Sequence, residues 1–230
     1  LGTYQTEEEA AKAPNDPNAQ GRKKHAGDAI FEDVNNDGQL DSKDMIFMGY
    51  VRPDKVGGII NTLKYKGLTV RIVMDWAMGH VIDNGFKGQI MGSSRNNNNA
   101  IKEAMTNSWQ SANDGSKYPK YTVQSDYDYQ YRNHMRWDNQ IGSSASGSTN
   151  NSLYFSKGDY LAFREVSLSY MLPLSWIRKM RLSAVEVFAG AYNIGYIKKY
   201  DGMFPEIYTG VDYGIYPRPR QYNMGVKINF

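Results

Sequence analysis

A chain of 230 residues has room for one large domain or two small ones, and its formal net charge of +3 is too small and too evenly spread to indicate a nucleic-acid partner. The absence of cysteine excludes a disulfide framework, a thiol nucleophile and a cysteine-ligated zinc site. No apolar run reaches the roughly 18 residues of a membrane-spanning helix. The mean hydropathy of −0.63 nevertheless fits a transmembrane β-barrel, whose strands alternate lipid-facing and lumen-facing residues.

Residues 1–55 are predicted to form a surface loop with an oxygen-rich motif. Ca²⁺ prefers six to eight oxygen ligands, and acidic or amide side chains at loop positions one, three, five and twelve supply them, with Gly38 making the sharp turn. The motif predicts a structural calcium site of weak affinity, with a dissociation constant on the order of 10⁻⁴–10⁻³ M. An Asx-rich turn without metal is the alternative, since position twelve is Asp rather than Glu. The predicted ligands are Asp33, Asn35, Asp37, the carbonyl of Gln39, Asp41 through a water, and Asp44.

Residues 56–82 are predicted to form a β-hairpin. Two β-rich runs, 56–65 and 68–80, flank Lys66-Gly67, a two-residue turn with glycine where a positive φ is needed. The second run alternates with period two, which is typical of a strand and not of a helix. One face carries Leu68, Val70, Ile72, Met74 and Trp76.

The alternation disappears over residues 83–158, where we expect a long loop with one short helix around 100–109. An irregular stretch of about 75 residues is unusual in a compact soluble domain but common on the outer face of a large barrel. Five tyrosines lie in this stretch, and packing within the loop or against a partner is favoured over stacking on sugar rings. They are Tyr118, Tyr121, Tyr127, Tyr129 and Tyr131.

Residues 159–197 predict a second hairpin and residues 221–230 a final strand, with a loop at 198–220 between them. In the strand at 159–172, Ala162, Val166, Leu168 and Tyr170 are predicted to share a face that Arg164 interrupts. In the strand at 183–195, Val185, Val187, Ala189 and Ala191 oppose Glu186, Phe188, Gly190 and Tyr192. The last strand has the cleanest alternation, with Tyr222, Met224, Val226, Ile228 and Phe230 on one face.

The connections between the five predicted strands run short, long, short, long. Outer-membrane barrels have short periplasmic turns and long extracellular loops, so 1–55, 83–158 and 198–220 are predicted to be extracellular. Predicted strands of about 10–13 residues also suit a tilted membrane-crossing strand better than the shorter strands of soluble sheets. Five strands leave open edges, which lipid does not tolerate. The sequence therefore predicts an all-β piece of a barrel that other strands complete.

Several stretches of the chain, in this order, resemble SusC/RagA-type TonB-dependent transporters of Bacteroidetes. The similarity runs from about Gly27 to Phe230. Each stretch is modest alone, and their shared order is specific. The stretches are Gly27-Asp28-Ala29-Ile30-Phe31-Glu32-Asp33-Val34-Asn35-Asn36-Asp37-Gly38, Tyr65-Lys66-Gly67-Leu68, the run 158–170, Asn193-Ile194, Lys199-Tyr200-Asp201-Gly202, Pro205-Glu206 and Tyr216-Pro217-Arg218-Pro219-Arg220.

The resemblance implies the last five strands of a 22-stranded barrel in the outer membrane of a Gram-negative bacterium. It implies import of oligosaccharides or peptides, a SusD-like lipoprotein lid on the extracellular loops, and a plug and TonB-contacting segment in an N-terminal part that is absent here. It also implies that Phe230 and the alternating residues before it are read by the barrel-assembly machinery, although an ordinary edge strand is the alternative. The first residues lack a signal peptide, so any export signal is expected upstream.

Two other classes of protein stay open at this stage. The 18 Tyr, 22 Gly and 4 Trp fit the aromatic girdles of a barrel, and they fit a soluble calcium-binding, glycan-binding β-domain equally well. A secreted glycosidase module is the third candidate. His25, His80 and His134 lie far apart in the sequence and no recognisable nucleophile or acid–base pair accompanies them, so we expect no enzyme.

Overall fold

The computed structural model describes residues 2–91, 101–116, 118–121, 128, 132–133, 152–207 and 209–230. The chain divides into two compact units. We call the first the loop unit; it comprises Leu1–Met48, Asp83–Phe155 and Val211–Gly214. The second, the sheet unit, comprises Gly49–Ile82, Ser156–Gly210 and Ile215–Phe230.

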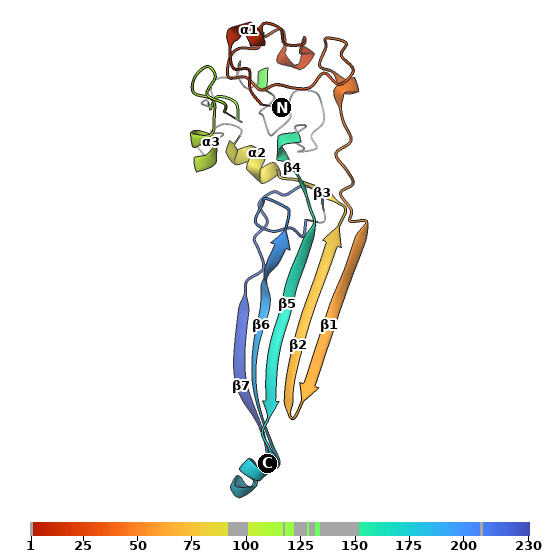
Figure 1. Cartoon of the computed structure of the whole chain (residues 1–230), viewed down its shortest axis with the longest axis vertical. Coiled ribbons are helices and arrows are strands. Elements are labelled where there is room, and N and C mark those ends of the chain that lie inside the picture. The colour runs from red at the N-terminus through yellow and green to blue at the C-terminus, as the bar shows by residue number, and fades with distance from the viewer. Residues whose placement is uncertain are drawn as a thin grey trace. The chain divides into compact units, whose positions relative to one another are not determined.

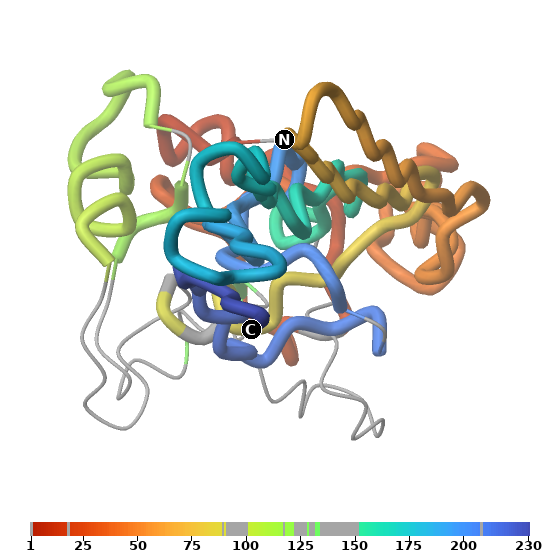
Figure 2. Tube along the Cα trace, turned by 90° about the horizontal axis from the view of Figure 1, so that it is seen from below, coloured from red at the N-terminus to blue at the C-terminus, as the bar shows by residue number. Residues whose placement is uncertain are grey.

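The sheet unit contains a five-stranded antiparallel sheet in the order β1-β2-β5-β6-β7 (Figure 1). Neighbouring strands along the chain are neighbours in the sheet, as the alternating short and long connections predict. β1 and β7 form its two edges, and the sheet does not close on itself (Figure 2). The strands are β1 (Lys55–Tyr65), β2 (Leu68–Met78), β5 (Tyr160–Met171), β6 (Ala184–Lys198) and β7 (Gln221–Asn229).

The turn between β1 and β2 has the geometry that its sequence predicts. Lys66 and Gly67 both have positive φ, 45° and 86°, as a two-residue hairpin turn of type I′ requires. A Cβ atom at Gly67 would also lie 2.8 Å from the carbonyl oxygen of Met171. Glycine is therefore needed here for its conformation and for the close approach of β5.

A β-bulge at Arg164 changes which residues of β5 share a face. Val73 pairs with Glu165 and Met74 with Phe163, so Arg164 has no partner in the ladder. The extra residue shifts the alternation by one position. Ala162 therefore lies beside Asp75, on the side opposite Val166, and the prediction that these two residues share a face is wrong.

The same irregularity continues into β6. Phe163 pairs with Gly195 and Glu165 with Tyr192, so two residues of β6 are accommodated between them. One of these, Asn193, has a φ of 51°, which asparagine tolerates better than most residues. The strand resumes beyond the bulge and ends at Lys198, later than the alternation of the sequence indicates.

The register gives the sheet two different faces, because directly paired residues project to the same side. The polar face carries most of the charged and hydroxyl side chains, together with Val56, Ile60, Val73 and Phe188. The apolar face carries Asn61 and the apolar residues Ile59, Leu63, Tyr65, Leu68, Val70, Ile72, Met74, Trp76, Met78, Leu161, Phe163, Val166, Leu168, Tyr170, Val185, Val187, Ala189, Ala191, Ile197, Tyr222, Met224, Val226 and Ile228.

The remaining elements are short. β3 (Val81–Asp83) and β4 (Phe155–Lys157) form a two-stranded sheet, and α5 (Leu174–Ile177) and η5 (Arg178–Met180) connect β5 to β6. Within the described residues, no helix has both the length and the apolar character to cross a membrane. The loop unit holds α1 (Glu7–Ala10), η1 (Pro17–Ala19), η2 (Ser42–Asp44), α2 (Gly85–Met91), α3 (Lys102–Thr106) and η4 (Ser152–Tyr154).

α3 corresponds to the helix expected around residues 100–109, whereas α2 is not indicated by the sequence pattern. α1 begins at Thr6, whose hydroxyl accepts a hydrogen bond from the amide of Glu9. Three glutamates in its first turn complement the positive end of the helix. Even so, the described residues of the loop unit form mainly irregular chain.

Candidate functional site

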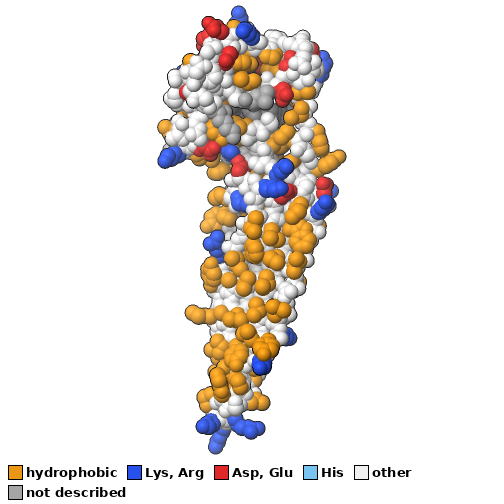
Figure 3. All heavy atoms as spheres, in the orientation of Figure 1, with side chains coloured by type: hydrophobic (Ala, Val, Ile, Leu, Met, Phe, Trp, Pro, Cys, Tyr) orange, Lys and Arg blue, Asp and Glu red, His pale blue; other side chains and the backbone are white. Residues whose placement is uncertain are grey.

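The apolar face of the sheet is exposed and not packed as a core. Tyr222 is 74% exposed and Met224 87%, and most large side chains of β1 on this face are similarly open. Figure 3 shows hydrophobic side chains gathered over the strands. A contiguous apolar surface of this kind marks an interface with a protein or a membrane. The strands have 11, 11, 12, 15 and 9 residues, near the roughly 9–11 that cross a bilayer at a tilt.

The residues of β7 lie as the alternation predicts. Tyr222, Met224, Val226 and Ile228 pair in turn with Ala191, Ala189, Val187 and Val185, so all eight share the apolar face. Phe230 follows the end of β7 and is 94% exposed. Its role, with the alternating residues before it, as an assembly signal stays a prediction.

On the polar face, charged side chains are paired. The Arg71 Nε atom lies 3.3 Å from a carboxylate oxygen of Glu165, and the hydroxyl of Ser167 donates to the other oxygen over 2.7 Å. These residues come from β2 and β5, side by side in the sheet. Arg71 and Glu165 thus neutralise each other on the polar face.

A buried carboxylate joins the 199–220 segment to the sheet. The Glu206 side chain is 1% exposed and lies between two guanidinium groups, with Arg164 Nη1 at 2.5 Å and Arg218 Nη2 at 3.2 Å. The hydroxyl of Tyr196 donates to Glu206 over 2.6 Å, and Arg164 also donates to both carboxylate oxygens of Asp75. A carboxylate buried this deeply requires such partners. We call these five residues the Glu206 clamp.

Aromatic rings surround the clamp. Tyr196 makes edge-to-face contacts with Tyr160 and Phe204, each with ring centroids 5.9 Å apart, and the Arg218 guanidinium lies 5.9 Å from the centre of the Phe204 ring. Ile82, Tyr200, Phe204 and Ile207 form a small buried cluster next to Tyr196. The bulge at Arg164 makes this arrangement possible, because it places that side chain on the same face as Asp75.

Sequence reasoning missed the clamp, although its parts were visible. Arg164 was the exception to the alternation of its strand, and Glu206 and Arg218 lie in stretches that carry the family resemblance. Nothing local indicated that the three meet, because Arg164 is far along the chain from the other two, and Glu206 and Arg218 lie in an irregular segment whose path only the fold determines.

The acidic motif forms a set of hydrogen-bonded turns. The Asp33 carboxylate accepts from the amides of Asp37 and Gly38, and the Asp44 carboxylate from those of Val34 and Asp41. The amide of Gln39 donates to the Asp37 carboxylate, and the amide of Lys43 donates to the Asp41 carboxylate. Asp41 and Asp44 together make the capping box at the start of η2.

These oxygens have the chemistry that Ca²⁺ prefers, but they are not gathered as ligands. Within the described residues, no three side chains of His, Cys, Asp or Glu lie close enough together to hold a metal ion. The Lys43 ammonium lies 3.3 Å from Asp37 and 3.7 Å from Asp41. Hydrogen bonds from Asn35 and Gln39, with Lys43 nearby, lower the pKa of the Asp37 carboxyl. The structure does not test calcium binding by this motif, which stays a prediction.

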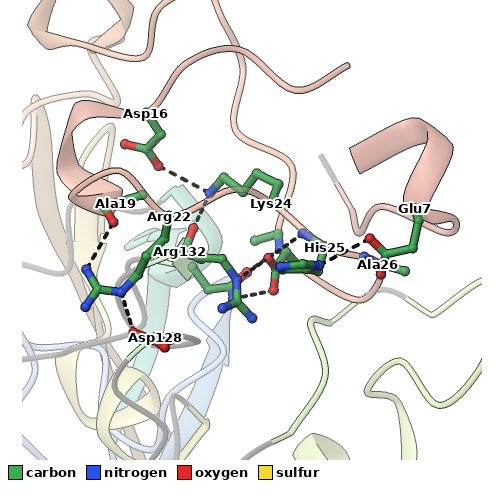
Figure 4. A network of polar contacts seen from close by, with 12 residues as sticks. Glu7, Asp16, Ala19, Arg22, Lys24, His25, Ala26, Asp128 and Arg132 are labelled. Carbon is green, nitrogen blue, oxygen red and sulfur yellow. Dashed lines mark hydrogen bonds and ion pairs between the residues drawn. The ribbon is translucent and has the colours of Figure 1, made fainter. Parts of the chain in front are cut away.

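Buried charges link distant segments of the loop unit (Figure 4). The Asp28 carboxylate accepts from Arg132 over 2.7 Å, from Asn133 over 2.8 Å and from the amide of His25 over 2.8 Å. Lys24 and Asp16, each with a side chain only 2% exposed, form an ion pair at 3.2 Å, and Lys24 also donates to the carbonyl of Arg132. Burial lowers the pKa of Lys24, which the Asp16 carboxylate partly offsets. The network fastens residues 16–31 to 132–133.

The described tyrosines of the long loop pack within the loop unit. Tyr118 lies in a buried cluster with Ala104 and Tyr154, which Tyr121 contacts, and the Tyr118 hydroxyl donates to Glu103 over 2.6 Å. This confirms the favoured prediction for Tyr118 and Tyr121. Tyr127, Tyr129 and Tyr131 lie outside the described residues.

The histidines give no catalytic arrangement within the part of the chain that the structure describes. His25 lies 3.2 Å from Glu7 in the loop unit, whereas His80 belongs to the sheet unit. Burial lowers the pKa of His80 in spite of the nearby Asp159. His134 is outside the described residues.

The fold and the two-faced sheet define an open antiparallel sheet of the kind found in large barrels, and comparison with known proteins makes the relationship specific. No family profile matches the chain. TonB-dependent receptor P3 of Formosa agariphila is 25% identical over 216 residues, or 89% of this chain and 19% of the receptor. TonB-dependent receptor P26 of the same organism is 24% identical over 243 residues, covering the whole chain and 22% of the receptor.

Solved structures share the fold. The RagAB peptide transporter matches 84% of this chain and 19% of its own chain with a TM-score of 0.62 at 21% identity. The 'open-open' state of the RagAB peptide importer matches 86% with a TM-score of 0.60 at 19% identity. The chain is thus a distant homologue of TonB-dependent receptors, and its sheet matches part of a receptor barrel. It spans about a fifth of the length of the curated relatives it matches. These relatives are receptors and transporters, which agrees with the prediction that the chain is not an enzyme.

Proposed function

We propose that this chain supplies five neighbouring strands, the closing ones as the family resemblance implies, to a 22-stranded barrel in a bacterial outer membrane. The single observation that carries the proposal is the exposed apolar face of a sheet whose other face is polar. Such a sheet is stable in a membrane with its apolar face toward acyl chains and its polar face toward a water-filled lumen. The open edges of β1 and β7 then require further strands as neighbours.

The lengths of the connections support one orientation. The turn at Lys66-Gly67 and the α5–η5 connection are short, whereas the segments before β1, between β2 and β5, and between β6 and β7 are long. In outer-membrane barrels the short turns face the periplasm. We propose that the long segments 1–55, 83–158 and 198–220 are extracellular, and that the Glu206 clamp holds the 199–220 segment against the strands at that end of the sheet.

The cargo we propose is a peptide or an oligosaccharide, taken up with energy from TonB through an N-terminal part of the protein. The solved relatives are named as peptide transporters, which favours peptides. A SusD-like lipoprotein is the partner we propose for the extracellular loops, and the barrel-assembly machinery is the proposed reader of Phe230. Calcium at the acidic motif would stiffen this surface and would take no part in transport.

Arginine substitutions on the two faces of β7 test the membrane proposal. Val226→Arg and Ile228→Arg both place a charge on the apolar face, at a cost of about 2–4 kcal/mol near the bilayer midplane. Ile228 is opposite Val185 at the hairpin end of the strands, so its substitution should cost less than that of Val226. Asn223→Arg, on the polar face of the same strand, is the matched control. Heat-modifiable migration of the protein from outer-membrane fractions measures barrel assembly. Loss for the first two variants and retention for the third are expected.

Two results would contradict the proposal. Equal effects at all three positions would refute the assignment of the faces. Recovery of the protein and its natural partner in a monomeric, soluble form without detergent would favour the glycan-binding β-domain instead.

A further inference from the structure

The connection between β5 and β6 is basic and amphipathic. Leu174 and Trp176 are each 63% exposed and Met180 is 60% exposed, while Ile177 of the same short helix is fully buried. Between the apolar residues stand Arg178, Lys179 and Arg181, all exposed. Residues 173–183 contain no acidic side chain. A turn between two strands does not require the exposed run from Arg178 to Arg181, so these side chains need another explanation.

The connection is fixed to the strands rather than hanging from them. The amide of Leu172 donates to the carbonyl of Val185 and that of Ser183 to the carbonyl of Asn229, each over 2.9 Å. Arg181 adopts the left-handed conformation that ends η5. The exposed side chains are therefore held at a defined place at the end of β5, β6 and β7.

The neighbouring turn adds to the positive charge. Lys66 precedes Gly67, whose carbonyl accepts from the amide of Met171 over 2.9 Å, so the two connections lie side by side. The acidic residue closest along the sheet, Glu186, stands opposite Lys227 in the ladder. In Figure 3, basic side chains gather at this end of the strands.

We propose that this surface, Lys66 with Leu174, Trp176, Arg178, Lys179 and Arg181, binds the anionic headgroups of the membrane leaflet on the hairpin side of the barrel. The proposal rests on the membrane function proposed above and extends it to a lipid class. Two observations point to lipid: residues 173–183 carry cations and no acidic side chain, and they lie at the end of the sheet that the apolar face reaches through Leu68, Tyr170 and Val185.

The side-chain types match the layers of a bilayer interface. Trp and aliphatic groups favour the boundary between acyl chains and headgroups. The long stems of Arg and Lys lie along that boundary while their charged ends reach phosphate oxygens, which guanidinium groups bind with two parallel hydrogen bonds. An anionic phospholipid supplies acyl chains to contact the exposed apolar side chains and negative charge to pair with the exposed cations.

Lipid selectivity of the complete transporter tests the proposal. The protein is reconstituted in phosphatidylcholine vesicles, and the association of spin-labelled phosphatidylglycerol is compared with that of spin-labelled phosphatidylcholine. In the variant R178Q/K179Q/R181Q the preference for phosphatidylglycerol should fall at least about threefold, because most of the local attraction to anionic lipid is removed. R52Q/K55Q/K157Q removes three exposed charges from the same unit and should keep the preference.

Salt dependence of the unaltered protein is the second measurement and does not depend on variants that fold. Raising salt from about 0.05 M to about 0.5 M should weaken the preference, because the charges are exposed and screened. The proposal is overturned if the unaltered protein shows no preference for phosphatidylglycerol. It is also overturned if the triple variant keeps that preference, or if the control variant loses it to the same extent. No preference in an assembled barrel, with a soluble protein bound to this surface instead, overturns it too. Heat-modifiable migration, measured first, separates these outcomes from failure of the membrane function itself.

Discussion

The two units of this chain treat polar and apolar groups in opposite ways. The sheet unit exposes the large apolar residues of one face and pairs its charges on the other. The loop unit buries charges, with Asp16, Lys24 and Asp28 almost inaccessible, and its described residues contain little regular structure. A charge is stable inside protein only with a partner, and an apolar face is stable outside only against another apolar phase. The contrast supports the proposal that the sheet unit faces an apolar phase.

The largest effect is expected where the sheet unit does bury charge. Arg164→Met leaves Glu206 with one cation fewer and Asp75 without its partner, so denaturant unfolding should show a loss of about 3–5 kcal/mol. Arg71→Met removes an arginine of the same face whose side chain is 43% exposed, and should cost about 1 kcal/mol or less. Similar losses for both variants would mean that the Glu206 clamp does not hold the 199–220 segment.

A comparable experiment in the loop unit sharpens the contrast. Lys24→Met removes the buried ion pair with Asp16 and should destabilise the protein by about 3–5 kcal/mol in the same assay. Arg22→Met breaks the pair with Asp128, whose side chain is 68% exposed, and should cost about 0–1 kcal/mol. A small effect at Lys24 would show that the buried network is not what fastens residues 16–31 to the rest of the loop unit.

Two glycines with the same backbone geometry separate conformation from crowding. Gly67 and Gly38 have φ of 86° and 80°, but a Cβ would meet the Met171 carbonyl oxygen only at Gly67. Gly38→Ala should cost about 1–2 kcal/mol for the left-handed conformation alone, and Gly67→Ala more than that. Thermal unfolding of the two variants measures the difference, and equal shifts of the midpoint would exclude a role for the close approach of β5.

The smallest expected effect is the loss of the hydrogen bonds to Asp114 at acid pH. Hydrogen bonds from the amides of Gln110, Ser116 and Ser111 lower the pKa of Asp114 to about 2. Because the folded pKa lies below the unfolded value of 3.8, the stabilisation is present above pH 3.8 and is lost as the pH falls toward 2. The protection of these amides, measured as the exchange rate relative to the intrinsic rate at each pH, should fall over this range in the unaltered protein and be uniformly low in Asp114→Ala. Unchanged protection at pH 2 would contradict the assignment.

Much of the sheet could be predicted because its signals are local. Alternation with period two located β1, β2, β5, β6 and β7, the Lys66-Gly67 turn predicted its hairpin, and the face of β7 was assigned correctly. Each of these follows from the geometry of a strand or of four consecutive residues. The resemblance to TonB-dependent transporters added the family, which the relatives support.

Tertiary structure alone decided the bulge and what it brings together. Arg164 reaches Asp75, 89 residues away, and Ala162 changes face because the register slips at that point. The buried pairs of Lys24 with Asp16 and of Arg132 with Asp28 were equally invisible, since a charged residue in a polar segment looks exposed until distant chain covers it. Alternation depends on neighbours along the chain and can be read from it. Register and charge pairing depend on residues that meet only when the chain has folded.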